Sequence, residues 1–264
     1  MSASILDLLL MLLATLSLLL WGNLHASVSC GLLFVLMLPV VALIALNMLE
    51  TALMRRRALV GMYLQPGSLL SRLLCRKAFL MLWQMLKAVV LGFVLFVEST
   101  GWPLWVWGLL GLDLLLLYPA HAGLRIWLAG QVKEMRRNII ARRMLVSLNT
   151  LVLLMLLVAG QMLTPRTDYS DMNWQETASH VAAGVQIDCE IMAPLARLAG
   201  LRDALTERLM VRGMLAAGSA WTGLGIWLLY FLWSGLVLWA WSRLLIGALG
   251  AGDALRYLQE SSCD

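Results

Sequence analysis

Hydrophobic residues run along this chain in six long stretches that shorter polar segments separate. Each stretch holds about as many residues as a helix needs to cross a bilayer, roughly 20. None shows the alternating apolar and polar positions that are typical of membrane barrel strands. Because backbone groups in lipid must satisfy their own hydrogen bonds, we predict an all-α, polytopic transmembrane helical bundle. The six spans are expected at Ile5–Trp21, Gly31–Met48, Ala78–Val97, Trp102–Ala120, Met144–Leu163 and Trp221–Leu245.

This pattern divides the chain into three parts. Residues 1–163 hold spans one to five with two basic loops, residues 164–220 form a polar segment, and residues 221–264 hold span six and a short tail. The polar segment is expected to fold as a small helical cap outside the membrane. Its helices are predicted over Met172–Val185, from Asp188 to about Gly200 with a disturbance at Pro194, and over Arg202–Met214.

Composition supports a membrane protein without a large soluble domain. The chain is 61% hydrophobic and 13% charged, whereas a soluble domain is typically about 45–50% apolar and about 25% charged. Several tryptophans lie near the ends of spans, where they are expected to anchor the helices at the two interfaces. These are Trp21, Trp102, Trp105, Trp107, Trp221 and Trp241.

The formal net charge of +5 has its source in two loops. Six basic residues fall in Met54–Lys77 and six in Gly123–Arg143. Basic loops between spans mark the cytoplasmic side, so both termini are expected in the cytoplasm and the cap outside. Nucleic-acid binding is not expected. The first span has no Lys or Arg before it and is read as an uncleaved span rather than a signal peptide. The compactness of the chain and its short loops favour a bacterial inner (plasma) membrane as the location.

Two charged residues fall deep inside adjacent spans. Lys87 and Asp113 each lie about 13 residues from the centre of the turn Glu98–Pro103, which places both roughly 20 Å from it at a rise of ~1.5 Å per residue. Charges at such depth usually pair or line a functional cavity. We therefore predict a Lys87–Asp113 ion pair, extended by Gln84 one turn before Lys87. It serves either as a structural bridge or as a proton or ion site.

The four cysteines form no Cys-x-x-Cys motif, so a redox motif or zinc ribbon is not supported. The predicted topology places Cys30 and Cys189 together outside, where an oxidising compartment permits a disulfide. Such a bond would tie the cap to the first pair of spans. The alternative is two free thiols that never meet.

The second basic loop contains an apolar stripe. Leu128, Val132, Met135 and Ile139 recur at spacings of four, three and four, which predicts a helix with one apolar face. A basic amphipathic helix of this kind lies in the headgroup layer or docks a partner helix. The alternative is an ordinary topology signal. The candidate headgroup or partner contacts are Lys133, Arg136, Arg137, Arg142 and Arg143.

The chain contains no nucleophile or phosphate-loop motif and no pair of histidines at metal-ligand spacing. We therefore expect no catalytic residue, metal or cofactor. The favoured function is a non-enzymatic subunit or accessory of an envelope transport or secretion assembly. Its partners would be the lipid bilayer and other envelope proteins, and self-association is also open. The alternatives are a small transporter or channel using Lys87 and Asp113, and a lipid-modifying membrane enzyme.

Overall fold

The computed structural model describes residues 3–25, 29–63, 77–132, 134–163, 176, 179–180, 183, 189–190, 192–212 and 220–252. Within these ranges all regular secondary structure is helical, and six helices are long and apolar enough to span a membrane. The predicted all-α bundle is thereby confirmed. The spanning helices are α1 (Ala3–Leu24), α2 (Cys30–Tyr63), α4 (Lys77–Ser99), α5 (Leu104–Leu128), α6 (Glu134–Leu163) and α9 (Ala220–Leu249), and α8 covers Ala193–Arg212.

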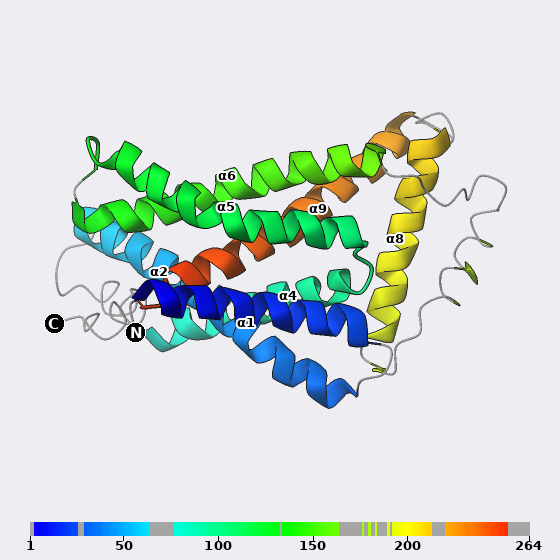
Figure 1. Ribbon diagram of the computed structural model, residues 1–264, viewed down its shortest axis with the longest axis horizontal. Helices are drawn as coiled ribbons and strands as arrows, with labels where there is room; N and C mark the ends of the chain where they lie inside the picture. Colours follow the sequence, from blue (N-terminus) through cyan, green and yellow to red (C-terminus); the bar gives the residue numbers. More distant parts are fainter. Residues whose placement is uncertain are drawn as a thin grey trace.

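The six long helices run side by side, and α8 crosses one end of the bundle (Figure 1). We call this the α8 end; α1, α4 and α6 finish there, at Leu24, Ser99 and Leu163. At the opposite end, called the far end, α1 begins at Ala3 and α9 finishes at Leu249. Because the six spans alternate in direction, the first begins and the last finishes at the same end.

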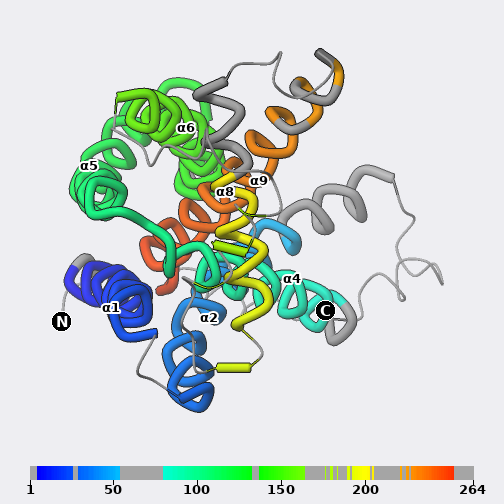
Figure 2. Tube along the Cα trace, turned by 90° about the vertical axis from the view of Figure 1, so that its right-hand side faces the viewer, coloured from blue at the N-terminus to red at the C-terminus, as the bar shows by residue number. Residues whose placement is uncertain are grey.

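The C-terminal half of α9 lies in the middle of the bundle, whereas its first turns extend to the periphery, as the view along the helices shows (Figure 2). It packs against α1, α2, α4 and α6. At Gly247 of α9, an added Cβ would lie 2.9 Å from the carbonyl carbon of Leu43, so the backbones of α9 and α2 touch there. Small residues allow such close approach between membrane helices.

The outer surface of the bundle is apolar. Large hydrophobic side chains are exposed on every spanning helix, for example Leu38, Leu82, Leu115 and Met155. Such a surface is suited to contact with hydrocarbon.

The cap differs from its prediction. Helix α8 continues from Ala193 to Arg212 through Gly200, where two separate helices were expected. Pro194 lies in the first turn, where a proline removes no helical hydrogen bond. Gly200 lowers helix stability by only about 1 kcal/mol and need not break it. The helix expected over Met172–Val185 lies largely outside the described residues.

The prediction of an amphipathic surface helix in the second basic loop is also wrong. Helix α5 continues to Leu128, residues 129–132 form a turn, and α6 begins at Glu134. The turn is closed by backbone hydrogen bonds from Gln131 and Val132 to the Leu128 carbonyl, both 3.0 Å. The apolar positions are therefore shared between two helices, so their spacing does not describe one helical face.

A polar core around α9 as candidate functional site

A hydrogen-bonded cluster of polar side chains lies where α5, α6 and α9 meet. The Asp113 side chain on α5 is only 7% exposed, and its Oδ2 accepts hydrogen bonds from Trp241 Nε1 at 2.8 Å and Asn149 Nδ2 at 3.2 Å. Asn149 Nδ2 also donates to Ser242 Oγ at 3.1 Å, and Thr150 Oγ1 donates to the same oxygen at 3.2 Å. These five side chains, called the Asp113 cluster, join three helices through groups that lipid could not satisfy.

The ion pair predicted between Lys87 and Asp113 does not form among the described contacts. Lys87 Nζ lies 5.0 Å from the centre of the Trp83 ring, one turn earlier on α4, while the Asp113 carboxyl is bound by α6 and α9. Gln84 lies on α4 and takes no part in the Asp113 cluster. Two side chains at the same depth in consecutive helices need not meet, because depth determines neither the rotation of each helix nor which helices pack together. Here α4 packs mainly on α2, whereas α5 packs on α6.

A buried ion pair joins α2 to α6 toward the far end. Arg142 Nη2 lies 2.6 Å from Glu50 Oε1, and the two side chains are 4% and 6% exposed. Arg142 also fills the space beside Gly250, which directly follows α9, where an added Cβ would lie 2.8 Å from Cζ of the guanidinium. Arg142 was predicted to contact headgroups or a partner, and it instead ties together helices of its own chain.

The other basic residues of that loop are placed differently. Arg143 is exposed and Arg137 is half-buried, so headgroup or partner contact stays a prediction for them. The side chain of Arg136 and the whole of Lys133 lie outside the described residues.

A second arginine, Arg243, links α9 to α2, and this link was not predicted from the sequence. Arg243 Nη1 donates to Asn47 Oδ1 at 2.7 Å and to Thr51 Oγ1 at 3.3 Å, and its Cζ lies 4.9 Å from the centre of the Trp239 ring. Asn47 and Thr51 are four residues apart and therefore share one helix face. The spacing of these two polar residues was the sequence signal that could have predicted a polar contact from another helix.

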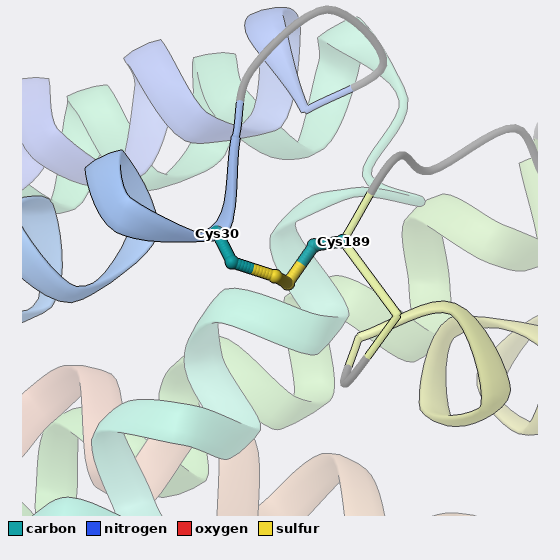
Figure 3. Close-up of a disulfide and its surroundings, with 2 residues drawn as sticks. All are labelled: Cys30 and Cys189. Carbon is teal, nitrogen blue, oxygen red and sulfur yellow. A yellow bond between two sulfur atoms is a disulfide. The ribbon is translucent and has the colours of Figure 1, made fainter.

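The cap is fixed to the bundle by several bonds at the α8 end. The predicted disulfide is present between Cys30, at the start of α2, and Cys189, just before α8, with the Cα atoms 4.9 Å apart (Figure 3). Arg202 of α8 donates two hydrogen bonds to the Glu98 carboxylate, at 2.6 and 2.9 Å. Trp233 Nε1 of α9 donates to the same carboxylate at 2.6 Å. The cap is thus held to α2 and α4, with α9 bound to the same carboxylate.

Two tryptophans that were expected at the interfaces lie inside the protein. Trp241 is fully buried in the Asp113 cluster, and Trp21 is fully buried with Nε1 donating to the Phe96 carbonyl at 3.0 Å. Trp221, in contrast, is exposed. Position near a span end does not distinguish an anchor in the headgroups from a tryptophan that turns inward to a polar partner.

Across the described residues, no group of three or more His, Cys, Asp or Glu side chains is placed to hold a metal ion. No family model, curated protein or solved structure matches this chain. Its function must therefore be inferred from the geometry of the bundle and its cap.

Proposed function

We propose that this protein is a non-enzymatic subunit or accessory of a larger envelope assembly that serves transport or secretion. One observation carries the proposal: the buried carboxylates of Glu50, Glu98 and Asp113 are each hydrogen-bonded to side chains of other helices in the same chain. Groups used in this way hold helices together and are not presented to a substrate. A rigid bundle with an anchored cap is suited to docking.

Helix α8 supports this proposal because contacts within the same chain already fix it to the bundle. The Cys30–Cys189 disulfide and the Glu98–Arg202 ion pair hold it against the bundle. Helix α8 also exposes Leu198. A preorganised surface loses less conformational entropy on binding than a free loop does.

We further propose that the protein lies in a bacterial inner membrane with the far end in the cytoplasm and the cap outside. The disulfide at the α8 end supports this orientation, since disulfides persist in oxidising compartments. Arg55, Arg56 and Arg57 belong to the part of α2 that follows its candidate span at the far end, where the charge rule places basic residues in the cytoplasm.

The test is gentle extraction of the natively expressed protein, followed by intact-mass measurement and identification of what stays bound. Other envelope proteins should copurify at a constant ratio. Arg202→Gln, which releases one anchor of the cap, should lower that ratio several-fold, whereas Arg197→Gln on an exposed position of the same helix should not. A lone monomer, or only copies of this chain, would refute the proposal.

A second candidate, a small transporter or channel, is favoured by the Asp113 carboxyl, which has no cationic partner among the described residues. Hydrogen-bonded Asn149 and Ser242 continue from it. In sealed vesicles containing the purified protein, Asp113→Asn should abolish proton or ion flux without unfolding the bundle, and Lys87→Gln should leave flux intact. Equal flux in the wild type and the Asp113 variant would exclude this function.

The third alternative, a lipid-modifying enzyme, would need reactive polar groups gathered near one interface. Glu50, Arg142 and Arg243 do lie toward the far end, but the Glu50 carboxylate is ion-paired with Arg142. That pairing favours a structural role. Turnover of labelled phospholipid by the purified protein would support the enzyme.

A further inference from the structure

Lys87 is a charged residue of a spanning helix that contacts no opposite charge within the described residues. Lys87 is half-buried on α4, and the described part of the chain offers it the ring of Trp83 but no carboxylate. Its neighbours on the exposed side of the helix are Leu86 and Val90, which are 54% and 53% exposed. We call Trp83, Leu86, Lys87 and Val90 the Lys87 face.

The depth of Lys87 makes an unpaired ammonium costly in free energy. The apolar part of α4 runs from Leu80 to Ser99, so Lys87 lies about 10 Å from one end and about 18 Å from the other at 1.5 Å per residue. The nearer interface is farther than a lysine side chain reaches from the helix. A cation–π contact offsets only part of the cost of placing an ammonium in hydrocarbon.

A second polar group lies beside it. Gln84, one turn before Lys87, is only 8% exposed, and no hydrogen bond of its side chain appears among the described residues. Lys87 is more exposed than Gln84, so it is the donor that an acceptor from outside the described chain could reach. A carboxylate would serve the ammonium best, because intramembrane charges usually pair with one another.

We propose that the Lys87 face binds a transmembrane helix of a different protein, whose Asp or Glu pairs with the Lys87 ammonium. This rests on the proposed function, because it specifies how the protein would join its assembly. Leu86 and Val90 would pack against the partner helix beside the ion pair. Such a pair also selects the partner, since a helix without the acid would leave the ammonium unpaired.

A second copy of this chain fits the face poorly. In the described spans, Glu50, Glu98 and Asp113 are buried and already hydrogen-bonded. Asp7 lies in the first turns of α1 at the far end and is engaged within its own chain. Within the described spans a copy therefore presents no carboxylate for Lys87, which favours a partner of another kind.

The experiment places a photo-crosslinking amino acid at Leu86 or Val90, one at a time, in the full chain within the membranes where it is naturally made. Leu115, which is 69% exposed on α5, is the control position. The first two positions should each label one discrete protein of a different sequence that has an Asp or Glu in a transmembrane segment. Leu115 should not label it.

Charge variants then separate the ion pair from mere proximity. Lys87→Gln should lower the yield of the adduct at least about fivefold, whereas Lys87→Arg should retain it. Lys87→Glu combined with the partner's acid changed to Lys should restore the adduct. The Cys30–Cys189 bond and the thermal unfolding midpoint serve as folding controls for each variant.

Four results would overturn the inference. Adducts to lipid alone, unchanged in Lys87→Gln, would mean that Lys87 extends to headgroups. Adducts only to a second copy would make the contact homotypic. A stoichiometric complex that survives Lys87→Gln and is not labelled from Leu86 or Val90 would remove the Lys87 contact while leaving the proposed function standing. A protein isolated without partners would remove both.

Discussion

Replacing either Glu50 or Arg142 by methionine should destabilise the bundle more than replacing both together. The two side chains meet at 2.6 Å and are 6% and 4% exposed, so each charge is desolvated and depends on the other. Removing one leaves the other charge buried. Methionine is chosen because its flexible side chain fills irregular space without a charge, which matters where Arg142 packs beside Gly250.

The expected magnitudes follow from this burial. Breaking a buried pair by removing one partner costs about 3–5 kcal/mol, whereas replacing both partners by apolar groups is often close to neutral. The two single variants and the double variant should therefore show a coupling energy of roughly 3 kcal/mol or more. In a chain of this size, each kcal/mol lowers the unfolding midpoint by about 2–4 °C, so each single variant should unfold about 6–20 °C earlier.

The assay is thermal unfolding of the purified protein in detergent, followed by tryptophan fluorescence. Arg143→Met is the control, because Arg143 is the exposed neighbour on α6 and should change stability by no more than about 0.5 kcal/mol. If the single variants unfold with that control, Glu50 and Arg142 are not a buried pair. If the double variant loses the sum of the two single losses, the residues act independently and the reasoning fails.

Other bonds between helices can be tested in the same way. Gly247→Ala should cost about 1–3 kcal/mol because the new methyl group overlaps the α2 backbone. Gly235→Ala, which meets open space on the same helix, should not lower the unfolding midpoint. Equal unfolding midpoints for these two variants would mean that α2 and α9 are not in close contact. Trp241→Phe removes the N–H that binds Asp113 and should cost about 1–3 kcal/mol, and an unchanged midpoint would argue against that hydrogen bond. Cys30→Ser should expose its bonded partner to thiol alkylation without reductant, detected as a mass shift; alkylation of that partner already in the wild type would show that the disulfide is absent.

Much of the architecture could be predicted because hydrophobic length is a local property. Six apolar stretches predicted six spanning helices, and the polar segment between the last two predicted a helical cap. The errors lie where local patterns have two outcomes. Pro194 begins a helix as readily as it disturbs one, and the apolar stripe that starts at Leu128 fits one surface helix or the ends of two.

The candidate site was harder to predict because it depends on helix rotation and on choice of neighbour. Lys87 and Asp113 were correctly identified as residues within adjacent spans, but Asp113 binds Trp241 and Asn149 while Lys87 contacts the Trp83 ring. Counting residues from a turn measures depth along the helix. It contains no information about the direction in which a side chain points.

The sequence alone was enough to determine membrane insertion, the number of spans and the all-helical class, because each depends on how many apolar residues follow one another. The contacts around Asp113, between Glu50 and Arg142 and from Glu98 to the cap arise only when the helices assemble. Lipid is as apolar as the side chains facing it, so hydrophobicity cannot select which helices pair. That choice is made by close backbone packing and by a few polar side chains from distant parts of the chain.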